Sequence, residues 1–334
     1  MTANASSSVT PLTARVLDLD APAEIERIAA RLREILRNQR KRGLVVAISG
    51  GVDSSVCAAL AVKAVGAQRV CTLILPEQDS SGNSARRAEM LAAQWGLKPL
   101  TVNIAPALEA VGCYSWRDEA MRRVVPGYGP DWRSKIAIRG GMNGQFNHFH
   151  LVAQSPSGEV HDVRLPLPEY LQIVAATSFK QRTRKMLEYF HADRLNYAVV
   201  GTPNRLEYDQ GFFVKTGDGA ADLKPIAHLY KTQVYALARE LELPEEITSA
   251  RPTTDTYSLA QGQDEFYFAL PYEQMDVALW AHNHKRTAEE LATALGITAE
   301  HAKLIYDDIE AKRRATAYLH MPPVLVDPVD EIQF

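Results

Sequence analysis

Val45-Val-Ala-Ile-Ser-Gly-Gly-Val-Asp-Ser-Ser55 is an apolar run that leads into two glycines, one carboxylate and three hydroxyls. The run predicts a buried strand, and the residues after it predict a helix. Glycines at such a junction let backbone N–H groups approach an anion at the helix N-terminus. Asp53 offers a carboxylate suited to Mg2+, and Ser49, Ser54 and Ser55 offer hydroxyls to phosphate oxygens. The stretch therefore predicts a pyrophosphate-binding loop.

Two other interpretations of this stretch are weaker. A kinase-like P-loop needs Gly-x-x-x-x-Gly-Lys-Ser/Thr, and residues 45–55 contain no lysine. A glycine-rich turn without a ligand would also suit a doubly wound fold. The dense hydroxyl and carboxylate content after the strand favours the phosphate loop.

The composition is that of a globular enzyme that acts on small molecules. Of 334 residues, 46% are apolar and 23% charged, and the net charge is -3. This balance gives no electrostatic reason to expect nucleic acid or a membrane as partner. Three cysteines without a Cys-x-x-Cys pair disfavour disulfides and structural zinc, and favour a cytoplasmic location. We expect residues 1–19 to be disordered and residues 20–334 to form one domain.

Strands alternate with helices along much of the chain. The periodicity predicts helices at 21–42, 54–65, 82–95 and 178–190 and strands at 44–48, 69–75, 98–104 and 197–200. Such alternation is typical of a parallel sheet with right-handed crossovers. The predicted fold class is α/β, a doubly wound, Rossmann-like parallel sheet with C-terminal helices and ligands at the carboxyl ends of its strands.

Residues 114–172 interrupt this pattern and are predicted to be an insertion. They are rich in tryptophan and basic residues, and two alternating runs flank Ser155-Pro-Ser-Gly158, as expected of a hairpin. A lid over the active site is the preferred hypothesis, and a flap at a dimer interface is nearly as well supported. His148, His150 and His161 could bind a metal, but a polar strand face is the more common reason for such spacing.

A second polar stretch lies at residues 201–233. It reads Gly201-Thr-Pro-Asn-Arg-Leu-Glu-Tyr-Asp-Gln-Gly-Phe-Phe-Val-Lys-Thr-Gly-Asp-Gly-Ala-Ala-Asp-Leu-Lys-Pro-Ile-Ala-His-Leu-Tyr-Lys-Thr-Gln233. Its carboxylates, lysines and glycines follow no hydrophobic period, which indicates a loop that organises charge. Together with Ser-Gly-Gly-x-Asp-Ser, this stretch resembles the ammonia-dependent NAD synthetase family of PP-loop ATP pyrophosphatases. The resemblance covers about residues 21–104 and 177–323, and motifs this long seldom match by chance.

The resemblance implies roles for particular residues. It places ATP against Ala47, Ile48, Ser49, Gly50, Gly51, Val52, Asp53, Ser54, Thr202, Lys231 and Thr253. It assigns Mg2+ to Asp53 and Glu207, which with Lys231 would carry the catalysis. It assigns the acceptor, nicotinate adenine dinucleotide, to Arg182, Lys215, Asp222 and Lys312. It also implies a homodimer.

The implied reaction forms an amide from a carboxylate. The carboxylate attacks the α-phosphorus of ATP, pyrophosphate leaves, and ammonia displaces AMP from the resulting acyl-adenylate. Catalysis of this kind depends on positioning and charge neutralisation. Nothing before residue 21 resembles a glutamine-hydrolysing domain, so ammonia is the expected nitrogen donor.

The sequence departs from the family pattern on the acceptor side. Tyr267, Ala269, Ala311 and Ser178 stand where the family has a carboxylate, a glycine, a histidine and an asparagine. A divergent paralogue that amidates another carboxylic acid therefore remains open. An RNA-modifying PP-loop enzyme is disfavoured by the acidic balance. A DNA-binding regulator, suggested by helix-turn-helix spacing at 287–298, is disfavoured because no basic recognition helix follows.

Overall fold

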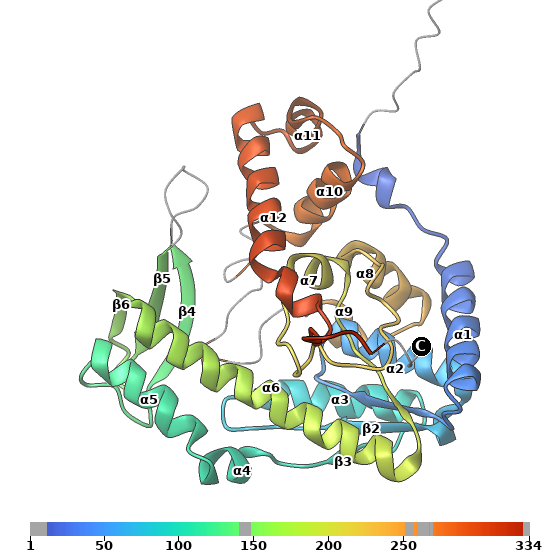
Figure 1. Ribbon diagram of the computed structural model, residues 1–334, viewed down its shortest axis with the longest axis horizontal. Helices are drawn as coiled ribbons and strands as arrows, with labels where there is room; N and C mark the ends of the chain where they lie inside the picture. The colour runs from blue at the N-terminus through green and yellow to red at the C-terminus, as the bar shows by residue number, and fades with distance from the viewer. Residues whose placement is uncertain (1–11, 140–147, 251–256, 260–266, 268–269, 330–334) are drawn as a thin grey trace, which may run out of the picture.

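The computed structural model describes residues 12–139, 148–250, 257–259, 267 and 270–329. The helices are η1 (Ala14–Leu17), α1 (Ala21–Asn38), α2 (Val52–Val65), η2 (Ala67–Arg69), α3 (Gly82–Gln94), α4 (Ala105–Ala110), α5 (Cys113–Val124), α6 (Leu167–Leu195), α7 (Arg205–Gln210), α8 (Lys231–Glu240), α9 (Glu245–Thr248), α10 (Tyr272–Asn283), α11 (Ala288–Leu295) and α12 (Ala299–His320). The strands are β1 (Leu44–Ala47), β2 (Val70–Ile74), β3 (Leu100–Thr101), β4 (Arg133–Arg139), β5 (His148–Gln154), β6 (Val160–Arg164) and β7 (Ala198–Val199). Figure 1 shows a central sheet, a smaller sheet beside α6, and α10–α12 packed above them.

The central sheet is parallel, in the order β3-β2-β1-β7. Alternate residues of β1 point to opposite faces. Leu44 and Val46 pack with α1, α2, α3 and α8, whereas Val45 packs with α5 and α6. Helices therefore cover both faces, and the predicted doubly wound α/β fold is confirmed.

Several predicted elements have other bounds in the structure. α1 ends at Asn38, because Arg40 adopts a left-handed backbone conformation with φ 53°. β3 pairs with β2 over only two residues, as an edge strand with an exposed Leu100. The expected disorder of residues 1–19 does not extend to η1, where Leu17 is buried; residues 1–11 lie outside the described part.

α6 differs most from its prediction. It spans 29 residues instead of the 13 in the range 178–190 and ends where Asn196 takes φ 54°. Its N-terminal half packs on α5 and on the second sheet, and its C-terminal half packs on the central sheet. Because its partners change along its length, the helix has no single apolar stripe, which is the signal that sequence analysis uses.

The second sheet is antiparallel, in the order β4-β5-β6. The predicted hairpin around residues 155–158 is confirmed, and β4 is a third strand that the sequence analysis missed. Ile136 and Leu151 are fully buried against Met121 of α5 and Ile173 of α6. His150 pairs with Asp162, and His161 stacks on Trp132, so these two histidines have other partners than a metal.

The segment at 287–298 contains α11 and leads directly into α12, which packs against it. Thr287 and Glu290 make the capping box of α11, and Leu291, Ala302 and Ile305 bury the faces that α11 and α12 share with α10. Within the described residues, no helix is both long and apolar enough to cross a bilayer.

A stability measurement can test the packing of the second sheet. Leu151→Ala should lower the free energy of unfolding by about 3 kcal/mol, because it removes a fully buried side chain between the sheet and two helices. Val160→Ala, on the exposed side of β6, should change it by less than about 0.5 kcal/mol. Equal losses in urea unfolding would contradict this packing.

Candidate active site

The loop between β1 and α2 has the shape of an anion-binding turn. Gly50 has φ +79°, and a Cβ there would lie 2.3 Å from the carbonyl oxygen of Ser84. Ser54 Oγ accepts the N–H of Ser49 at 3.2 Å, so a side chain of α2 fixes the loop. Ser55 is fully buried and donates to the carbonyl of Gly51. The prediction that the Ser55 hydroxyl faces phosphate is wrong, because Ser55, unlike Ser49 and Ser54, does not line the cavity described next.

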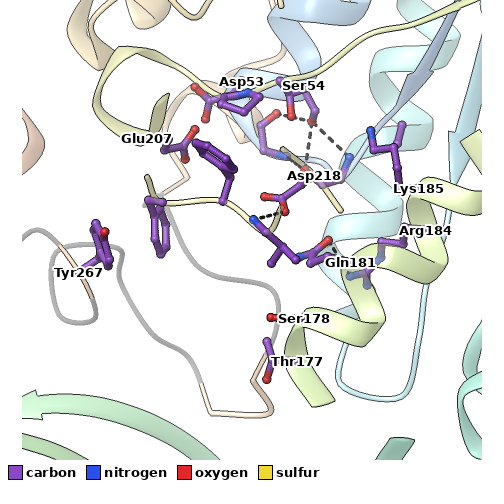
Figure 2. A pocket seen from close by; sticks show the side chains of 18 of the residues that line it. Asp53, Ser54, Thr177, Ser178, Gln181, Arg184, Lys185, Glu207, Asp218 and Tyr267 are labelled. Atoms are coloured by element: carbon purple, nitrogen blue, oxygen red, sulfur yellow. Dashed lines mark hydrogen bonds between the residues drawn. The ribbon is translucent and has the colours of Figure 1, made fainter. Parts of the chain in front are cut away.

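A cavity of about 990 Å3 opens over this loop. Its lining includes the ends of β1 and β2, one side of α6, residues 212–216 and 218, and α12. Its size matches the upper end of small-molecule sites. Figure 2 shows Asp53, Glu207 and Asp218 around one part of it, with Thr177 and Ser178 further along α6.

Two carboxylates and one lysine meet at the loop end of the cavity. Lys231 is 2% exposed and pairs with Asp53, which also accepts the side-chain amide of Asn204 at 3.2 Å. Glu207 accepts the backbone N–H of Asn204 at 3.0 Å within the capping box of α7. All three charged groups line the cavity.

The pKa values in this group reflect burial and mutual charge. Burial, followed by the negative charge of Asp53, raises the pKa of Glu207 to about 8, against the opposing effect of Lys231. Burial alone would lower the pKa of Lys231, but Asp53 and Glu207 raise it above its ordinary value. Two acids thus share one lysine. Their hard oxygen ligands suit a divalent cation such as Mg2+, which proteins often hold through one or two carboxylates and substrate phosphates.

A buried thiol lies behind this group. Cys57 is one helical turn beyond Asp53 on α2 and is fully buried. Burial, then the charges of Asp53 and Glu207, raise the pKa of its thiol well above the ordinary value.

Most of the residues assigned by resemblance line the cavity. Those for ATP are Ala47, Ile48, Ser49, Gly50, Gly51, Val52, Asp53, Ser54, Thr202 and Lys231, and those for the acceptor are Arg182, Lys215 and Lys312. Asp222 lies outside the lining, where its carboxylate accepts the N–H of Val199 at 2.7 Å. Thr253 lies outside the described residues.

α6 supplies polar residues that the sequence analysis missed. Lys185 and Glu188 form a buried ion pair at 2.6 Å, and Arg184 donates to the carbonyl of Leu75 at 3.1 Å. Asp218, quoted above without a role, is half-buried and also lines the cavity, and desolvation raises its pKa. The signal was the spacing of charged residues three and four apart on a helix that faces the sheet.

Buried ion pairs fix the loop after β2, which forms a wall of the cavity through Pro76, Ser80 and Ser81. Lys180 of α6 contacts Glu77 at 3.2 Å and also pairs with Asp79, which Arg117 of α5 contacts as well. These ion pairs therefore hold the loop after β2 against α5 and α6.

The comparisons with known proteins agree with this site. The sequence model of the NAD synthase family matches residues 24–125 and 162–316. The chain belongs to the NAD synthase family. The predicted family is confirmed, and with it the predicted reaction class, an ATP-dependent carbon–nitrogen ligase. The unmatched residues 126–161 contain β4, β5 and the start of β6.

Curated relatives include full-length matches. The NH(3)-dependent NAD(+) synthetase of Rhizobium meliloti (strain 1021) is 55% identical over 322 residues, covering 96% of both chains. The synthetase of the same name from Thermotoga maritima is 38% identical over 255 residues, which are 75% of this chain and 84% of the relative.

Solved structures support the fold. NMN synthetase from Francisella tularensis has a TM-score of 0.65 at 21% identity and covers 92% of this chain and 99% of its own. NH3-dependent NAD synthetase from Campylobacter jejuni has a TM-score of 0.62 at 21% identity, covering 93% and 100%. At such identities the likeness concerns the fold alone.

The raised pKa of Glu207 predicts a pH-dependent stability. The folded protein binds this proton more tightly than the unfolded chain, so stability is lost as pH rises from the ordinary pKa of 4.5 through about 8. In metal-free buffer, the free energy of unfolding of Glu207→Gln should therefore rise by a few kcal/mol relative to that of the wild type between about pH 5 and pH 8. Urea unfolding at several pH values measures this difference; parallel pH curves for both proteins would contradict the assignment.

Proposed function

We propose that the protein converts nicotinate adenine dinucleotide to NAD+ with ATP, Mg2+ and ammonia. The observation that carries the proposal is the meeting of Asp53, Glu207 and Lys231 at a phosphate loop inside one large cavity. The same cavity also exposes Arg182 and Lys215, which suit an anionic acceptor. ATP and the acceptor can therefore bind in the same cavity at the same time.

The loop end of the cavity would hold the triphosphate. The N–H groups at the start of α2 and the ammonium of Lys231 stabilise negative charge that grows as pyrophosphate departs. Asp53 and Glu207 would hold Mg2+, which supplies further charge neutralisation when bound. Lys231 can stabilise the departing pyrophosphate without moving, because its pairing with Asp53 already fixes its ammonium group at the cavity.

The acceptor carboxylate would approach the α-phosphorus from the α6 side. Arg182 Nε donates to the backbone carbonyl of Lys215 at 3.3 Å, whereas the ammonium of Lys215 donates to the carbonyls of Tyr318 and Met321 at 2.7 and 3.1 Å. The attacking nitrogen must lose a proton as the amide forms. We assign this proton to Asp218, which lines the cavity and whose pKa desolvation raises.

A pyrophosphate-release assay tests the function. With ATP, Mg2+ and ammonium, the wild type should release pyrophosphate with nicotinate adenine dinucleotide and form NAD+. Asp53→Ala and Glu207→Ala should each reduce turnover at least about a hundred-fold, whereas Asp307→Ala, at an exposed carboxylate of α12, should not. Normal turnover in either site variant would sink the mechanism.

The same assay distinguishes NAD+ synthesis from the amidation of another carboxylic acid. Turnover with another carboxylic acid of a panel, and none with the dinucleotide, would show a divergent paralogue. The departures at Ser178, Tyr267 and Ala311 motivate this comparison, because all three line the cavity. The location of the protein in the cell stays a prediction from the sequence.

We also propose a homodimer formed through α6. Four large apolar side chains of α6 are exposed, namely Leu167 (66%), Leu171 (53%), Met186 (65%) and Phe190 (59%). Leu167 and Leu171 are four residues apart, as are Met186 and Phe190, so each pair forms a small apolar patch on the helix surface. Exposed apolar patches of this kind are typical of a protein interface.

Sedimentation velocity tests the dimer. Met186→Glu should shift the protein from dimer to monomer, because it places a charge in the exposed apolar patch that Met186 forms with Phe190. Val160→Glu, on the exposed side of β6, should leave the dimer intact if the second sheet is not part of the interface. A monomer with Val160→Glu alone would favour the interface flap over the lid.

A further inference from the structure

The cavity has a second end that the adenylation chemistry does not use. α6 lines it from Tyr170 to Glu188, and these 18 residue steps at 1.5 Å each span about 27 Å. Lys185 and Glu188 lie toward the phosphate loop, and Arg182 lies between the two ends. The distal part begins at Tyr170, which packs against the core shared with the second sheet.

Aromatic side chains from three chain segments line this distal part. Phe149 of β5 stacks on Tyr170 of α6, with ring centroids 4.0 Å apart and planes at 17°. Tyr257 lines the same cavity and belongs to the buried cluster on which both of these rings pack. We call Phe149, Tyr170 and Tyr257 the aromatic end.

The second sheet also anchors part of the aromatic end. Ser134 of β4 accepts the N–H of Leu259 at 3.1 Å, and its own N–H donates to Ser258 Oγ at 2.8 Å. Phe149 belongs to residues 126–161, which the family model leaves unmatched. The aromatic end therefore combines Phe149, from outside the matched ranges, with Tyr170 and Tyr257, from within them.

The order of groups along the cavity matches an elongated ligand. A phosphate loop, then cations at Arg182 and Lys215, then aromatic rings would suit a reacting acid, a charged linker and a planar base in that order. Planar bases stack on aromatic side chains irrespective of their hydrogen-bonding edges. We infer that the aromatic end binds the planar base at the end of the acceptor remote from its reacting carboxylate. This inference rests on the proposed function and makes Phe149 a specificity-determining residue.

Binding measurements without ATP test the inference. Calorimetry would give the Kd of nicotinate adenine dinucleotide and of nicotinate mononucleotide, which lacks the remote base. The wild type should bind the dinucleotide at least about ten-fold more tightly, and Phe149→Leu should reduce that ratio about ten-fold, the scale of one base stacked on one ring. Phe149→Tyr should retain the ratio, because it keeps the ring.

Phe179→Leu is the matched control. Phe179 lies on the same helix as Tyr170 but packs edge-on against Trp116, outside the cavity. This variant should keep the wild-type ratio. Should Phe149→Leu weaken both ligands equally, or should the wild type show no preference, the inference is overturned.

Turnover separates this inference from the function it rests on. If the wild type forms NAD+ but Phe149→Leu keeps the full ratio of the two Kd values, only the inference about the aromatic end is refuted. If the wild type forms no NAD+, the proposed function is refuted, and the inference that rests on it is refuted as well.

Discussion

The pairing of Lys231 with Asp53, beside the half-buried Glu207, is the interaction on which the site depends. Each of these residues lies in the first turn of a different helix, α8, α2 and α7. Helix N-termini carry partial positive charge, which offsets part of the repulsion between the two acids. Asp276 of α10 accepts the backbone N–H groups of Lys231 and Thr232, so the C-terminal helices are fastened to the same point. Removing one partner would leave a buried charge without compensation.

α6 connects the parts of the molecule that serve this centre. One side lines the cavity, another ties the loop after β2 through Lys180 and Arg184, and a third leaves apolar residues exposed. Phe149 of the second sheet and residues 47–54 at the phosphate loop line the same cavity, which α6 borders from Tyr170 to Glu188. One long helix therefore connects the second sheet with the phosphate loop.

The sequence predicted those features correctly that depend on a local pattern of residues typical of one kind of structure. The phosphate loop, the alternating core elements and the capping box at Thr287 could be predicted, because each depends on neighbours in the chain. The full length of α6 and the strand β4 could not, since their burial depends on partners distant in sequence. Spacing alone also could not separate Asp222, which accepts a backbone N–H beside β7, from the residues that line the cavity.

The buried thiol of Cys57 has a chemical consequence for the centre. Thiolates, and not thiols, react with peroxides and alkylating agents. Because burial and the adjacent acids raise the pKa of Cys57, its sulfur stays protonated beside Asp53. The centre therefore contains a sulfur atom that contributes packing without making the phosphate site a target for oxidative damage.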